Sequence, residues 1–208
     1  MSTLLLPAFT KGFVLSAGLI VAIGAQNMFV LRQGLKREHV GPIVLFCATA
    51  DAVLIVAGVN GLGAALNLIP GLSLGLSLGG AAFLSWYGIQ ALRRATHPAM
   101  LVVDDRPSIA LGAALAGATA FTFLNPHVYI DTVMLMGAVG ASLPPAQRPA
   151  FMIGAVTASL TWFATLGYGA RLIAPLFARP AAWRVLDLSV GVMMLALAAS
   201  LLQRVATG

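Results

Sequence analysis

Charged residues are scarce in this chain, and their scarcity excludes most soluble folds. Only 9% of the 208 residues are charged, while 60% are hydrophobic. A typical soluble domain has about 25% charged residues, and so few charges cannot cover a water-facing surface. A lipid bilayer lets most of a protein surface stay apolar, and helices satisfy their own backbone hydrogen bonds there. The composition therefore predicts an all-α polytopic membrane protein whose surroundings are the lipid bilayer.

Features of several enzyme classes and of nucleic-acid-binding proteins are also missing. The single cysteine, Cys47, excludes an intramolecular disulfide and the dithiol pair of a membrane thiol oxidoreductase. His127 has no Cys or His at metal-ligand spacing, and GLGAAL near Asn60 lacks the strand and the acidic residue of a dinucleotide site. The net charge of +6 comes from basic residues between apolar runs, as in cytoplasmic loops of membrane proteins. We expect no enzymatic activity, cofactor, metal site or nucleic-acid partner.

Six apolar runs divide the chain, and a spanning helix needs about 20 apolar residues. The runs cover residues 8–31, 40–66, 71–92, 109–142, 151–170 and 181–202. The first run also fits a signal peptide, but its length and the runs that follow favour a first spanning helix. We therefore predict six transmembrane helices in a single domain of residues 1–208.

Basic residues are unevenly distributed over the connectors between these runs. Three of them, Lys11, Arg148 and Arg204, belong to the face that carries both termini. The other nine lie in or beside the first, third and fifth connectors: Arg32, Lys36, Arg37, Arg93, Arg94, Arg106, Arg171, Arg179 and Arg184. Because cytoplasmic loops are enriched in Lys and Arg, the nine predict the cytoplasmic face, and both termini are expected outside.

The six runs also suggest two repeats of three spans each. The first repeat covers about residues 8–92 and the second about 109–205, joined by a polar connector at 93–108. Asn27 and Asn125 are 98 residues apart, and at that offset Val30 meets Val128. Halves with an odd number of spans are oppositely oriented in the membrane, and such inverted repeats place the binding site where the halves meet.

The fourth run is too long for one straight helix. Its 34 residues would extend about 51 Å, against about 30 Å for the hydrocarbon core. Asparagine is a preferred N-cap and proline is favoured at the first helical position, so Asn125-Pro126 predicts a helix start inside the membrane; a plain proline kink is the alternative. In the first run, Gly24 to Asn27 predict a similar break. Unpaired N–H groups at such a start suit an anionic group of a substrate.

Two acids lie inside apolar runs: Asp51 near the middle of the second and Asp131 in the later half of the fourth. Ionisable residues inside a membrane face the bundle interior and mark substrate or proton pathways. Neither of these two runs contains a basic residue, lysine or arginine, that would balance the acid. Either the acids are protonated, with Asp51 bonding a neighbouring helix for structure, or a cation comes and goes between them. The second interpretation favours a cationic substrate.

Two further polar residues follow the predicted helix start. His127 and Asp131 are four residues apart and share a helix face, as do Asn125 and Tyr129. An acid–imidazole pair can titrate near neutral pH. Hydrogen bonding between helices explains His127 and Tyr129 equally well, so both interpretations stay open.

A stripe of small residues in the third run predicts a close-packing face. Gly71, Gly75 and Gly79 repeat at intervals of four, which lets helix backbones approach closely. This face suits a homodimer or a contact within the chain.

Two segments with polar residues, one in the first apolar run and one in the fourth, resemble the sequences of a known family. IGAQNMFVLRQGL closely resembles the hallmark of the LysE family of amino-acid exporters, and LNPHVYIDTVMLMG resembles its second hallmark, LNPHVYLDT. Asp51-Ala52 and GGAAFLSWYGIQALRRA fit the same family, so the similarity covers about residues 18–140. The main departure is Ile130, where the family has leucine. GAQN together with HVYID resembles the lysine and arginine branch, since exporters of neutral amino acids typically have GPN.

The resemblance implies an exporter of L-lysine, L-arginine or both in the bacterial inner membrane. It also implies transport roles for Asp51 and Asp131, which we expect to alternate between a proton and the substrate cation. We expect substrate contacts from Gln26, Asn27, Asn125, His127 and Tyr129. The alternatives are an exporter of divalent metals or of other amino acids from the same superfamily. An intramembrane aspartyl protease fits less well, because neither acid lies in a GxGD motif.

Overall fold

The computed structural model describes residues 2–20, 24–61, 71–96 and 109–207. All regular elements within these ranges are helical, which confirms the all-α prediction. The first part of the chain forms α1 (Ser2–Ile20), α2 (Ala25–Lys36), α3 (Val40–Val59) and α5 (Leu72–Thr96). The second part forms α6 (Leu111–Phe123), α7 (Pro126–Val128), the π-helix η2 (Tyr129–Leu135), α8 (Met136–Ala141), α9 (Arg148–Ile173), the 3₁₀ helix η3 (Ala174–Ala178) and α10 (Pro180–Thr207).

Length and composition make three described helical segments suitable for crossing a bilayer: Val40–Val59, Arg148–Phe177 and Ala181–Gln203. The pair α1 and α2 counts as a fourth span if its 82° bend lies within the membrane. The fourth apolar run does not count as one span, because it is divided into the shorter apolar helices Leu111–Phe123 and Tyr129–Ala141. The described chain therefore contains three or four candidate spans by this criterion, against six apolar runs in the sequence.

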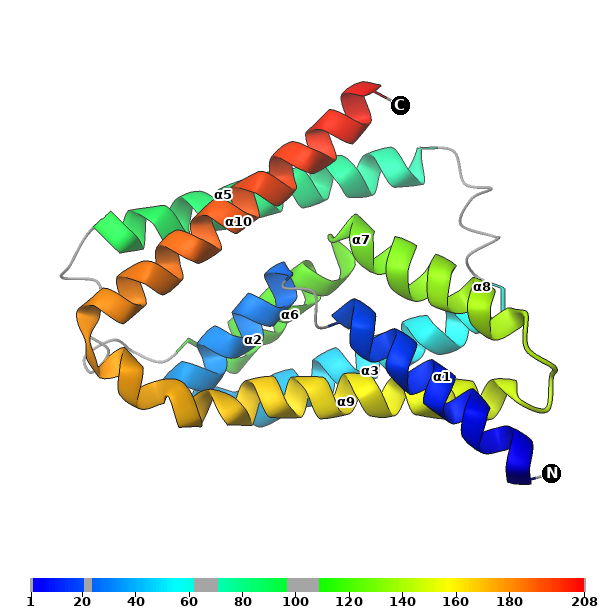
Figure 1. Cartoon of the computed structure of the whole chain (residues 1–208). Coiled ribbons are helices and arrows are strands. Elements are labelled where there is room, and N and C mark those ends of the chain that lie inside the picture. Colours follow the sequence, from blue (N-terminus) through cyan, green and yellow to red (C-terminus); the bar gives the residue numbers. More distant parts are fainter. Residues whose placement is uncertain (1, 21–23, 62–70, 97–108, 208) are drawn as a thin grey trace.

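The helices pack in two groups that meet around α2 and α6. Figure 1 shows α5 and α10 side by side along one flank, and α9 along the other. Helices α1, α2 and α3 pack on α9, while α8 and η2 pack on α3. The end of α5, the end of α9 and the start of α10 lie at the same end of the bundle (Figure 1). This end, where most of the basic residues gather, is called the basic end below.

Glycines let several of these helices cross with their backbones in direct contact. A Cβ atom added at Gly154 of α9 would overlap the carbonyl oxygen of Phe9 in α1, and one at Gly12 would overlap that of Phe151. Gly58 of α3 meets α8 at Gly137 in the same way. Such crossings increase van der Waals contact between helices, which is a main source of association within lipid.

The predicted glycine stripe does not take part in this packing. No described atom lies within 4 Å of a Cβ added at Gly71, Gly75 or Gly79. Helix α5 instead meets α10 through Gly88 and Gly191; a Cβ at Gly88 would lie 3.1 Å from Met194 Cβ. Within the described residues, the alternative of a contact inside the chain is therefore wrong for the stripe, because α10 covers a different face of α5.

Replacing Gly154 by alanine should destabilise the crossing of α1 and α9, because the added methyl group meets backbone that cannot rotate away. Overpacking of this kind costs about 1–3 kcal/mol. Gly169→Ala, also in α9, is the matched control, since its nearest neighbour is Thr165 Cγ2 at 3.8 Å. We expect a lower melting temperature and less monodisperse protein in detergent for Gly154→Ala alone. Equal melting temperatures for the two variants would contradict the crossing.

Candidate functional site

Helix breaks in both halves of the chain bring polar groups together around a cavity of about 250 Å³. Its walls come from the end of α1, the start of α2, the middle of α3, the segment α7–η2, and single residues of α8 and α10. Six of the seven residues that the sequence suggested for the substrate lie on its surface: Gln26, Asn27, Asp51, Asn125, His127 and Asp131. Both predicted halves therefore contribute to one site.

Asn27 links the two sides of the first break. Helix α2 begins after Gly24, whose backbone is extended (φ −111°, ψ 173°), and no side chain caps the helix. Asn27 donates a hydrogen bond from Nδ2 to the carbonyl oxygen of Ile20 at 2.7 Å, so the end of α1 is tied to α2. Trp162 of α9 donates from Nε1 to Asn27 Oδ1 at 3.3 Å. The uncapped start of α2 leaves backbone N–H groups and a partial positive charge at the cavity.

The second break has the N-cap that the sequence predicts. Helix α6 ends at Phe123, and Pro126 is the first residue of α7. Asn125 Oδ1 accepts a hydrogen bond from the backbone N–H of His127 at 3.1 Å. Tyr129 donates its hydroxyl proton to the carbonyl oxygen of Phe123 at 3.0 Å, satisfying an acceptor at the end of α6. Tyr129 is not among the residues that line the cavity, and its observed bond is the helix-stabilising one.

The two acids, Asp51 and Asp131, line the cavity from two different helices. Asp51 lies in α3 and is 8% exposed, and its Oδ2 accepts a hydrogen bond from Ser159 Oγ of α9 at 2.7 Å. Asp131 lies in the π-helix η2 and is only partly buried. Within the described residues no hydrogen bond joins Asp131 to His127. The π-helical turn replaces the i to i+4 pattern on which the expected pair depends, and such turns are frequent at functional sites.

Gln26 brings an unused donor to the same cavity. The residue is 8% exposed, and its Nε2 atom has no hydrogen-bond partner among the described residues. A buried donor without an acceptor costs about 1–3 kcal/mol. A bound ligand that supplies a carboxylate or carbonyl oxygen would remove this cost.

Three polar residues with structural roles were missed by the sequence analysis: Ser159, Trp162 and Asp187. Ser159 and Trp162 are three residues apart in α9, so they share a helix face, which is a signal that the fifth apolar run contained. Asp187 is a third acid inside the last apolar run; its side chain is 1% exposed and pairs with Arg32 and Arg94. Asp187 lies three residues after Arg184, near the start of the last apolar run, where charged residues are common.

Helices broken inside apolar runs, with acids and helix starts around one cavity, are features of secondary transporters. The LysE type translocator family matches residues 17–204, and the chain therefore belongs to this family of multi-pass membrane transporters. It is a transporter and not an enzyme.

Two relatives show how close the similarity is. The chain is 48% identical over 178 residues to a protein of Mycobacterium tuberculosis provisionally named an amino-acid transporter, covering 86% of this chain and 88% of that protein. It is 42% identical over 197 residues to the arginine exporter protein ArgO of Yersinia enterocolitica, covering 91% and 93%. No solved structure matches the chain.

Replacing Tyr129 by phenylalanine should separate its two possible roles. The substitution removes only the hydroxyl that bonds Phe123, and losing such a bond costs about 1 kcal/mol. We expect a lower melting temperature and an unchanged apparent affinity for the exported amino acid. A weaker affinity with unchanged melting temperature would instead place the hydroxyl on the substrate.

Proposed function

We propose that this protein exports L-arginine and L-lysine from the cytoplasm in exchange for protons. The observation that carries the proposal is the meeting of Asp51, Asp131 and the uncapped start of α2 in one cavity. Membership of the LysE family supports amino-acid export in general. The name of the Yersinia relative supports arginine in particular.

The charges of the cavity fit the charges of a basic amino acid. Such a substrate carries one carboxylate, one α-ammonium group and one side-chain cation. The N–H groups at the start of α2 and the free Nε2 of Gln26 suit the carboxylate. Asp51 and Asp131 suit the two cations, and His127 lines the same cavity. Asn27 and Asn125 act mainly by holding the breaks, because an oxygen or nitrogen of each side chain already bonds the chain itself.

Coupling to protons follows from the net charge of the substrate. A cation that leaves a negative-inside cell moves against about 2.3 kcal/mol per 100 mV. Exchange of one substrate cation for one inward proton moves no net charge and removes this penalty. A carboxylate that holds either the proton or the substrate cation performs the exchange. Asp51 and Asp131 are the acids that line the cavity.

Two side chains of α9 hydrogen-bond to residues that line the cavity. Ser159 donates to Asp51, and Trp162 donates to Asn27, so one helix face holds both an acid and the first break. These two residues are positioning residues in our proposal. They fix the carboxylate and the start of α2 relative to each other.

The helix contacts support two inverted repeats and six spans. The proposed spans are α1–α2, α3, α5, α6–α8, α9 and α10. The second spans α3 and α9 pack together, as do the third spans α5 and α10. Helix α2 packs on α9, and its counterpart η2–α8 packs on α3; α1 packs on α9, and its counterpart α6 packs on α3. This exchange of partners is what a two-fold relation between halves produces.

Other candidates have less support. In the described parts of the chain, no three His, Cys, Asp or Glu residues gather in a group suited to a metal ion, whereas transported metals need such ligands. A homodimer through Gly71, Gly75 and Gly79 stays a proposal. The open space beside the three glycines supports it.

Uptake of labelled arginine by inverted vesicles tests the proposed function. An acidic lumen should drive arginine inward, because the outward-facing membrane surface of these vesicles is the cytoplasmic one. Asp51→Asn and Asp131→Asn should each reduce the rate at least 10-fold, since neither amide can release a proton. Lysine should compete with arginine, and Cd²⁺ or Mn²⁺ should not. Normal rates in both variants would refute the coupling, and competition by the metals alone would favour the metal exporter.

Replacing Ser159 by alanine should weaken substrate binding through Asp51. We expect a several-fold higher KM for arginine with a smaller change in kcat, because the orienting donor is lost while the acid remains. Ser159→Thr keeps a hydroxyl and should restore the KM. Thr157→Ala is the matched control in α9, since its hydroxyl bonds only the carbonyl oxygen of Ile153. An unchanged KM in Ser159→Ala would show that Asp51 does not depend on this bond.

A further inference from the structure

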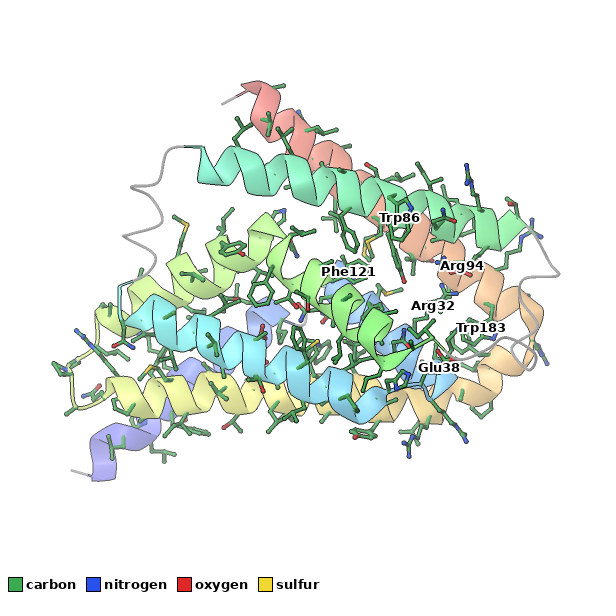
Figure 2. The ribbon with its side chains drawn as sticks, turned by 180° about the vertical axis from the view of Figure 1, so that it is seen from behind. Arg32, Glu38, Trp86, Arg94, Phe121 and Trp183 are labelled. Atoms are coloured by element: carbon green, nitrogen blue, oxygen red, sulfur yellow. The ribbon has the colours of Figure 1, made fainter. Side chains whose placement is uncertain are left out.

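A buried acid joins three helices at the basic end of the bundle. Asp187 of α10 has a side chain that is 1% exposed. Its Oδ1 atom accepts hydrogen bonds from Arg32 Nη1 of α2 and, at 3.3 Å, from Arg94 Nε of α5. Figure 2 shows Arg32 and Arg94 approaching each other from their two helices, next to Trp183 at the start of α10. Helix α2 is therefore attached to the pair α5–α10 by charge.

This cluster is poorly suited to a purely stabilising role. Taking an ion out of water is costly, and a buried ion pair returns this cost only when its geometry is good and its remaining polar atoms have partners. Here two cations share one carboxylate oxygen, and Arg94 Nη2 is buried without a hydrogen-bond partner among the described residues. Attraction and desolvation nearly cancel in such a cluster. When water reaches the ions as they separate, the regained hydration offsets the lost attraction, which a switching contact requires.

An aromatic layer lies against the ion pairs. The guanidinium carbon of Arg94 is 5.6 Å from the ring centroid of Tyr87. The Tyr87 ring packs edge-on against Phe121 of α6 at 4.7 Å, and Phe121 also packs against Phe29 of α2 at 5.2 Å and Phe83 of α5 at 4.8 Å. Phe121 is 1% exposed and occupies the centre of the bundle (Figure 2). The rings fill the space between α2, α5 and α6.

Both layers lie between the cavity and the basic end. Along α2, Asn27 lines the cavity, and Phe29 and Arg32 follow; Arg32 is five residues beyond Asn27, or about 7.5 Å along the helix axis. Along α10, Leu197 lines the cavity and Asp187 lies ten residues closer to the basic end, about 15 Å. Two of the three helices that hold the cluster, α2 and α10, thus also line the cavity.

We propose that the Arg32–Asp187 ion pair is the latch of a gate at the basic end, closed in this structure, with the aromatic layer as its seal. The inference rests on the proposed function, because a transporter must open its site to each side in turn. Helices α5 and α10 pack closely through Gly88 and Gly191, so they move as one unit, and Arg94 moves with Asp187. Opening separates this unit from α2 and breaks the Arg32–Asp187 pair. The positive-inside rule makes this gate the cytoplasmic one.

Accessibility of a cavity cysteine tests the gate without using transport. The buried Cys47 is first replaced by alanine, and Ser16→Cys places a thiol of similar size in the cavity wall. A membrane-impermeant methanethiosulfonate reagent is then added to inverted and to right-side-out vesicles. We expect Arg32→Gln to raise the labelling rate at least fivefold in inverted vesicles only. Arg94→Gln should leave the rate near that of the parent, because Asp187 then keeps Arg32 as its single partner.

Controls separate the possible failures of this experiment. Arg184→Gln removes an exposed charge from α10, one turn before Asp187, and should not change labelling. Asp187→Asn should raise labelling as Arg32→Gln does, if the Asp187→Asn variant folds. Arg32→Gln is expected to fold because the Arg94–Asp187 pair remains. An unchanged rate in Arg32→Gln, or an equal rise in Arg94→Gln, overturns the latch. A rise only in right-side-out vesicles overturns the cytoplasmic assignment. Failure of the unmodified protein to take up arginine would refute the proposed substrate and leave the gate standing.

Discussion

The structure depends on one constraint: a helix broken inside an apolar run must find partners for its freed backbone groups. Water is scarce in such a place, and each unsatisfied group is costly. At the first break the Asn27 side chain takes the carbonyl oxygen of Ile20. At the second, Asn125 caps the new helix and Tyr129 takes the carbonyl oxygen of Phe123. Much of the polarity in the two hallmark segments is therefore explained by holding the breaks, and the unpaired Nε2 of Gln26 belongs to a residue that lines the cavity.

The same constraint explains why the site consists of few charges and many backbone groups. A charge inside a membrane is expensive, so it occurs where it faces a cavity or a partner. Asp51 has Ser159 as a partner and the cavity as its other neighbour. Helix α9 thus controls the acid on one side and, through Trp162, the start of α2 on the other. A substrate that binds between them contacts two elements whose relative position is set by a third.

How well each feature could be predicted depends on where its information lies in the chain. The breaks and the cavity residues follow from local chemistry: a proline, an asparagine or a glycine inside an apolar run is informative by itself. The hydrogen-bond partners of these residues do not follow from local chemistry. Ser159 is 108 residues from Asp51 in the sequence, and Asp187 is 155 residues from Arg32. The glycine stripe and the expected His127–Asp131 pair show a different limit. Periodicity indicates which residues share a face, but it does not say which neighbour covers that face or where a π-helical turn changes the period.

The first hallmark segment forms a short helix that links the cavity to the ion pair at the basic end. Helix α2 has 12 residues, with cavity residues at its start and Arg32 near its end. The extended backbone of Gly24 precedes it, so α2 does not share one continuous ladder of helical hydrogen bonds with α1. A ligand at its start and an ion pair near its end then act on one short rigid body. Both helices rest on α9: Gly12 of α1 meets Phe151, and Gly34 of α2 meets Gly167. A break in this position thus lets α1 and α2 cross α9 at separate places while the end of one and the start of the other line the cavity.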